Sequence, residues 1–209
     1  MRCWIPLLVT LPMHAHPGPD TPWVRHAVDD TSRGADGVRL SDVNGDDLPD
    51  IVTGWEEGGV TRAYLHPGVD QVGQPWPKVD VGKTPSVEDA VWADLDGDGA
   101  TDVVTSCEGG TRSLFVHWAP KASADFLDAE AWARQSFPAA EKVTSWMFAV
   151  PMQVDGKHGP DLVVGSKSKD AMIGWLEAPA DPRNVDDWKL HKLTTAGWIM
   201  SIRTLDLES

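Results

Sequence analysis

The chain has 209 residues, a formal net charge of −14 and two cysteines. This length is enough for one or two domains with a sizeable core. The acidic surplus disfavours DNA, RNA and anionic membrane surfaces as partners, because no basic stripe offsets it.

Residues 1–15 have the pattern of a secretory signal peptide: one positive charge, a short apolar run and a small residue at the end. A disordered tail is the alternative. The run is too short to cross a bilayer, so no membrane insertion is expected. Cleavage would remove Cys3 and leave Cys107 alone, which predicts no disulfide. We therefore expect a secreted or periplasmic protein whose mature part spans 16–209.

A tryptophan then recurs every 53 to 56 residues, and each copy precedes a loop of related sequence by 18 to 21 residues. The four copies are Trp23, Trp76, Trp132 and Trp188. A period of this size is typical of solenoids, propellers and other repeat arrays. Each period has room for four short strands: before the loop, after the loop, before a proline, and around the tryptophan. Packing between repeats is the expected role of these four tryptophans.

The first two loops both read D-x-[DN]-x-D-x-x-x-D and begin 52 residues apart. Oxygens at positions 1, 3, 5 and 9 converge when the chain turns tightly, and Ca²⁺ takes about 6–8 such ligands. Unpaired carboxylates at this spacing would repel one another, so a bound cation is expected. The predicted calcium ligands, including a backbone carbonyl at position 7 of each loop, are Asp42, Asn44, Asp46, Leu48, Asp50, Asp94, Asp96, Asp98, Ala100 and Asp102. Strand-forming residues follow both loops, which excludes an EF-hand.

The third loop, residues 153–161, keeps the spacing but has Gln153 and Lys157 where two ligands belong. The Lys157 ammonium could replace the ion and satisfy Asp155 and Asp161, or it could simply be solvated. Both interpretations predict the same backbone shape without metal. In the first loop, Asp47 stands where the second loop has glycine, so we expect it to adopt a left-handed conformation.

These patterns predict an all-β protein, a β-propeller of four-stranded blades, present as an incomplete arc of about three blades plus flanking strands. Residues 23–28 would be an orphan closing strand. The blades are expected at about 34–80, about 86–137 and about 144–193, with a fourth beginning at about 197–209. Propellers close with about 4–8 blades, so the remaining blades of a longer chain are expected partners.

With these loops and strands in place, residues 23–209 resemble the FG-GAP/VCBS repeat family, whose calcium-loop blades also build the integrin α-subunit propeller. The resemblance is specific in the first two repeats and weaker in the third. It implies a propeller fold, with each loop between a blade's first and second strands, and calcium as the bound ion. It implies no single activity.

Four further tryptophans leave two readings open: core packing, which is the default, or a stacking platform for a sugar ring. They are Trp55, Trp118, Trp146 and Trp198. Arg62 and Arg112 follow matching Gly-Gly turns and could pair with nearby acid or bind an anion.

Catalytic motifs are absent from the sequence. His66 and His117 end predicted strands where a rim would lie; each could act as a base, although surface accommodation is the simpler role. His26 and His191 share one place in the period, which favours a structural role.

The leading interpretation is an exported calcium-binding module that binds or scaffolds an extracellular glycan or protein without catalysis. The alternative is a polysaccharide lyase or sugar dehydratase built on a propeller. The segment 174–179, Gly-Trp-Leu-Glu-Ala-Pro, weakly resembles a stretch that such propellers share. Convergent His, Tyr and Arg would favour the enzyme, and a flat tryptophan-rich face would favour the binder.

Overall fold

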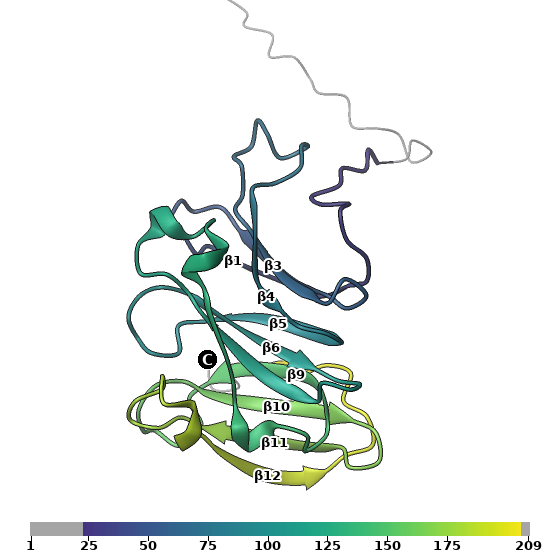
Figure 1. Cartoon of the computed structure of the whole chain (residues 1–209), viewed down its shortest axis with the longest axis vertical. Coiled ribbons are helices and arrows are strands. Elements are labelled where there is room, and N and C mark those ends of the chain that lie inside the picture. The colour runs from purple at the N-terminus through teal and green to yellow at the C-terminus, as the bar shows by residue number, and fades with distance from the viewer. Residues whose placement is uncertain (1–22, 206–209) are drawn as a thin grey trace, which may run out of the picture.

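The computed structural model describes residues 23–205, which form three four-stranded antiparallel sheets (Figure 1). The first sheet contains β1 (Ala35–Ser41), β2 (Asp50–Trp55), β3 (Val60–Tyr64) and β4 (Lys78–Lys83). The second contains β5 (Val87–Ala93), β6 (Asp102–Cys107), β7 (Ser113–Trp118) and β8 (Ala133–Ser136). The third contains β9 (Ser145–Met152), β10 (Asp161–Lys167), β11 (Met172–Glu177) and β12 (Lys189–Thr195). Four short 3₁₀ turns lie in the connections: η1 (Ser123–Asp125), η2 (Ala129–Ala131), η3 (Pro138–Ala140) and η4 (Val185–Asp187).

Within each sheet the spatial order of the strands is their order in the chain. In Figure 1 the three sheets follow one another along the long axis, from the blue first sheet to the yellow-green third. The first strand of the second sheet, β5, lies against both β1 and β9. The predicted all-β architecture of propeller-like blades is therefore confirmed, and the three sheets do not close into a ring. The sheets span residues 35–83, 87–136 and 145–195, where the sequence predicts blades at about 34–80, 86–137 and 144–193.

The hydrophobic core lies between neighbouring sheets. One cluster joins the second and third sheets around Trp146 and Trp188, and another joins the first and second around Val52 and Trp132. Nearly every residue of β5, β6 and β7 is buried, because the second sheet is covered on both faces. Such a sandwiched sheet needs continuous apolar runs rather than alternation.

The segment before the first sheet departs from the prediction. Residues 23–28 are assigned to no strand, and Trp23 is 92% exposed, so Trp23 does not pack between repeats in this structure. The Val28 carbonyl accepts a hydrogen bond from the Trp76 N–H at 3.1 Å, and Asp29 attaches the chain to the first sheet. The buried carboxylate of Asp29 accepts hydrogen bonds from Arg62 at 2.8 Å, Lys78 at 2.6 Å and the Tyr64 hydroxyl at 2.9 Å.

At the other end, residues 197–205 also form no strand, although one is predicted to begin there. An isolated bridge joins Trp198 to Lys167 at the end of β10. The predicted signal peptide, residues 1–15, and the final residues 206–209 lie outside the described part of the chain. Among the described residues, no helix has the length and apolar character needed to cross a membrane.

Candidate metal centres

The three loops that join the first two strands of each sheet share one backbone shape. Positions 4 and 6 of every loop adopt positive φ, which is the left-handed region that favours glycine. At position 4 the φ angles are 77° at Gly45, 71° at Gly97 and 76° at Gly156; at position 6 they are 64° at Asp47, 88° at Gly99 and 46° at His158. The third loop therefore keeps this shape although Gln153 and Lys157 replace the acidic residues at positions 1 and 5.

The side chain at position 1 holds each turn. Its oxygen accepts a hydrogen bond from the position-4 N–H at 2.8 Å, whether the acceptor is Asp42, Asp94 or Gln153. Burial alone would raise the pKa of Asp42, but backbone N–H groups in its loop outweigh burial and lower that pKa. The Asp42 carboxylate is thus held in the charged form that a metal ligand needs.

In the second loop the carboxylates converge. Oxygens of Asp94, Asp96 and Asp102 all lie within 4.8 Å of one another. The Ala100 N–H, at position 7, donates to the carboxylate of Asp98 at 2.9 Å. This oxygen-only donor set fits a hard cation such as Ca²⁺.

The first loop has the same ligand positions, with an amide at position 3. The Leu48 N–H donates to Asp46 at 2.9 Å, and Nδ2 of Asn44 donates to the other oxygen of Asp46 at 3.1 Å. The side chains of Asp42, Asn44, Asp46 and Asp50 again offer only oxygen as possible ligand atoms, so this set also fits Ca²⁺. The carbonyl oxygens of Leu48 and Ala100 remain predicted ligands.

The aspartate at position 9 has a second role that the sequence did not reveal. Asp50, Asp102 and Asp161 are at least 99% buried. In each loop, one oxygen accepts the position-2 N–H and the other accepts an N–H just after the third strand of the sheet. For Asp161 both distances are 2.8 Å. This carboxylate therefore links the loop to the end of the third strand in all three sheets, including the one whose loop has Gln153 and Lys157 at two ligand positions.

Burial raises the pKa of Asp102 to about 7, against the opposing effect of its backbone hydrogen bonds. Burial likewise raises the pKa of Asp50, and the nearby carboxylates of Asp46 and Asp42 add to the rise. A cation in either loop would stabilise the charged form of these buried acids.

The third loop contains its own cation. Nζ of Lys157 lies 2.6 Å from Asp155 and 3.3 Å from Glu177 on β11. Of the two aspartates that Lys157 could satisfy, it pairs with Asp155, while Asp161 is satisfied by the backbone. Hydrogen bonding to Lys157 lowers the pKa of Asp155. With Gln153 and Lys157 at two of the ligand positions, this donor set does not fit a metal ion.

An arginine from the third sheet also reaches the second loop. Arg183, in the connection from β11 to β12, pairs with Asp96 and, at 3.2 Å, with Asp98. Its guanidinium lies 4.8 Å from the Trp118 ring centre. Sequence reasoning missed this contact, because 87 residues separate Arg183 from Asp96 and neither position shows a pattern that links them.

Most of the other candidate residues are structural. Trp55, Trp118 and Trp146 are buried, as expected for core packing, whereas Trp198 is 60% exposed. His117 is fully buried, so its predicted place on a rim is wrong. It lies near the end of β7, in the second sheet, which is covered on both faces. His191 pairs with Glu177 at 2.7 Å, a carboxylate partner that sequence reasoning missed.

The two candidate arginines also have structural partners. Arg62 and Tyr64 both donate hydrogen bonds to the Asp29 carboxylate. No histidine joins these side chains, so they do not form the convergent His, Tyr and Arg that would favour an enzyme. Arg112 donates to the Val143 carbonyl at 3.0 Å.

A search of curated proteins finds no match to the chain. The family model described as an FG-GAP-like repeat matches residues 21–105, which include the whole first sheet and both oxygen-rich loops. The resemblance inferred from the loop spacing is therefore confirmed over residues 21–105, the part of the chain that matches the FG-GAP-like repeat.

Proposed function

We propose that the chain is an exported, calcium-binding propeller module that binds an extracellular glycan or protein without catalysing a reaction. The observation that carries the calcium part is the contrast between the loops. Asp94, Asp96 and Asp102 converge within 4.8 Å in the second loop, whereas Lys157 supplies the cation in the third. Calcium in the first two loops would neutralise carboxylates that repel one another and would stiffen the link between strands.

Export is part of the proposal for a thermodynamic reason. Extracellular calcium modules work with dissociation constants of about 10⁻⁴–10⁻³ M, which only extracellular calcium concentrations fill. The signal-like residues 1–15 support the same localisation. The acidic surface, at −14 before any ion binds, supports a glycan or protein partner rather than a nucleic acid.

Calorimetric titration with calcium tests this proposal. The wild type should bind two ions, the Asp42→Asn/Asp46→Asn variant one, and the Asp94→Asn/Asp98→Asn variant one. Chelator should lower the melting temperature of the wild type. Absence of calcium heat together with no chelator effect would reject the proposal.

A further inference from the structure

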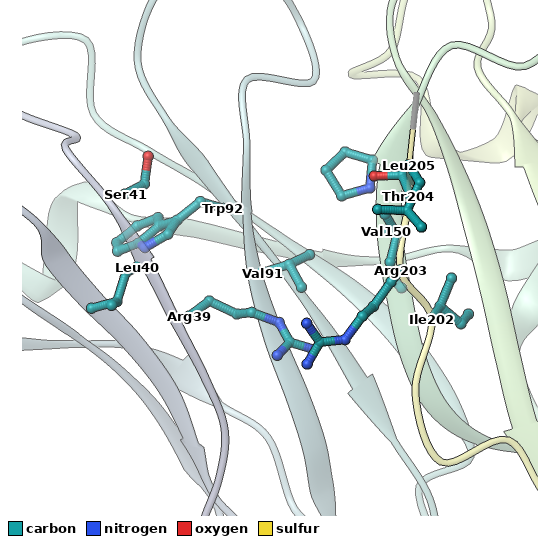
Figure 2. Close-up of a pocket in the computed structure, with 12 residues that line it drawn as sticks. Arg39, Leu40, Ser41, Val91, Trp92, Val150, Ile202, Arg203, Thr204 and Leu205 are labelled. Carbon is teal, nitrogen blue, oxygen red and sulfur yellow. The ribbon is translucent and has the colours of Figure 1, made fainter. Parts of the chain in front are cut away.

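A cavity of about 430 Å³ lies at the inner edge of the arc, and the function proposed above gives it no role (Figure 2). Its wall comes from the first strands β1, β5 and β9 and from residues 202–205. Its volume lies within the range of about 300–1,000 Å³ that is typical of ligand pockets. The three sheets and the last described segment thus all contribute to one hollow.

One position of the repeat determines the chemistry of this cavity. The residues three places before each loop are Arg39, Val91, Val150 and Arg203. All four line the cavity, so the same repeat position supplies arginine in the first and fourth copies and valine in the two between. Figure 2 shows the guanidinium groups of Arg39 and Arg203 pointing toward one another across the space.

The two guanidinium groups are not neutralised equally. Arg39 has a partner, since its Nη2 lies 3.1 Å from the buried carboxylate of Asp89. A guanidinium has five N–H donors, so most donors of Arg39 stay available. Arg203 forms no ion pair within residues 23–205. Two facing cations repel, and an oxyanion between them would convert this repulsion into charge-assisted hydrogen bonds.

The rest of the wall suits a ligand with an organic body. Val91, Val150 and Pro151 form an apolar side, while Ser41 and Thr204 add hydroxyl groups. Trp92 also lines the cavity, and its buried Nε1 has no hydrogen-bond partner among the described residues. Such a combination of a few polar donors on an apolar surface is typical of small-molecule sites.

We propose that this cavity binds an organic carboxylate, such as an acidic sugar, with the carboxylate held between Arg39 and Arg203. The ligand body lies on the valine side, and the hydroxyl groups of Ser41 and Thr204 face its polar groups. This inference names a ligand class for the binding module proposed above and rests on that role, but it does not require calcium.

Titration calorimetry with sodium glucuronate, glucose and sodium sulfate tests the site. The wild type should bind glucuronate and not glucose, because only glucuronate carries the carboxylate. Arg203→Gln should weaken glucuronate binding by about tenfold or more, the cost of one charge-assisted hydrogen-bonding partner. Arg39→Gln should have a similar effect. Arg203 forms no ion pair with the described residues, so its variant keeps the test valid if Arg39→Gln fails to fold.

Arg33→Gln is the matched control, since Arg33 is an exposed arginine paired with Glu57 and takes no part in the cavity wall. It should bind glucuronate like the wild type. Equal weakening in Arg33→Gln, equal binding of glucose, or sulfate binding as tight as glucuronate would each overturn the proposal, as would no glucuronate binding at all. Calcium titration of the same samples distinguishes this failure from failure of the proposed calcium role.

Discussion

At the scale of single residues, the ninth loop position shows how one side chain can serve both the fold and an ion. Asp161 makes the same two backbone contacts as Asp102, yet its loop holds a lysine in place of a ligand. The carboxylate is therefore needed for the blade even where no ion is expected. In the first two loops it would bind calcium in addition.

Asp161→Asn should lower the free energy of unfolding by about 2 kcal/mol, because the amide N–H₂ replaces an acceptor for a buried N–H donor. The loss should be the same with calcium and with chelator. Asp155→Asn, a change in the same loop at an exposed ion pair, should cost well under about 1 kcal/mol. Urea unfolding measures both variants. A loss for Asp161→Asn that appears only with calcium would show that its role is metal binding.

His117 gives the molecule a pH dependence of known sign. Its Nδ1 donates to the Val81 carbonyl at 3.1 Å, so its Nε2 accepts from the Thr105 hydroxyl at 3.1 Å. Burial lowers the pKa of His117 from 6.5 to about 4. The unfolded chain then binds this proton more strongly than the folded chain, so stability present above pH 6.5 is lost as the pH falls toward 4.

His117→Gln removes this titration. The stability difference between wild type and variant should shrink by about 3 kcal/mol between pH 7.5 and pH 4. Buried acids with raised pKa values, such as Asp89, act in the opposite direction but are present in both proteins and cancel in the difference. His158→Gln makes the same replacement at an exposed loop position and should follow the wild type. A difference that does not vary with pH would contradict the assignment.

At the scale of elements, the connection from β11 to β12 contributes to the loop of the neighbouring sheet. The Arg183 guanidinium pairs with two of the predicted ligands in the second loop, and Lys121 lies 3.3 Å from one of them, Asp98. Although burial would raise the pKa of Asp98, its backbone hydrogen bond and these cations lower it. A positive charge this close competes with a divalent ion for the same oxygens.

Arg183→Gln should therefore strengthen calcium binding at the second loop by about three- to tenfold. The titration is done in the Asp42→Asn/Asp46→Asn background, where only the second loop remains. Arg33→Gln in that background should leave the affinity unchanged. Weaker calcium binding after Arg183→Gln would mean that the arginine positions the carboxylates rather than competing for them.

The third loop offers the converse change. Its backbone already has the shape of the other two, and compared with the second loop only the residues at positions 1 and 5 differ in charge. Gln153→Asp with Lys157→Asp should create a third calcium site, counted by calorimetry. Gln153→Asp alone keeps the ammonium and should bind two ions, like the wild type. A double variant that still binds two ions would show that backbone shape and ligand type are not sufficient.

The strands and loops were predictable because they depend on local signals that recur with the period. The apolar runs after each loop and the glycines at position 4 identify the first two strands and their turn in every repeat. The sequence did not predict the hydrogen bonds to Asp29, the ion pairs of Arg183 with the second loop, or the cavity between Arg39 and Arg203. They join residues 33 to 164 positions apart, and only the packing of one sheet on the next brings them together.

At the scale of the whole molecule, the open arc exposes apolar surface at both ends. On β1, Val38 is 54% exposed and Leu40 62%, and on β12 Leu193 is 63% exposed. Exposed strand surface of this kind favours association with another chain, and closed propellers hide it.

The 209-residue chain should therefore self-associate. Leu40→Lys should shift the 209-residue chain toward the monomer mass of 22.7 kDa, because it places a charge on the open face. Leu127→Lys, at an exposed loop leucine outside that face, should not. Light scattering decides the matter, and a wild type that is monomeric at all concentrations would contradict this prediction.

The central claim is that the first two loops are calcium sites and the third is not. A crystal structure of the chain grown with calcium tests it most directly, because anomalous scattering locates the ions independently of the refined coordinates. We predict one peak among Asp42, Asn44, Asp46 and Asp50, and one among Asp94, Asp96, Asp98 and Asp102. We predict no peak within residues 153–161. Empty first and second loops at millimolar calcium, or an ion in the third loop at normal calcium–oxygen distances, would contradict the account.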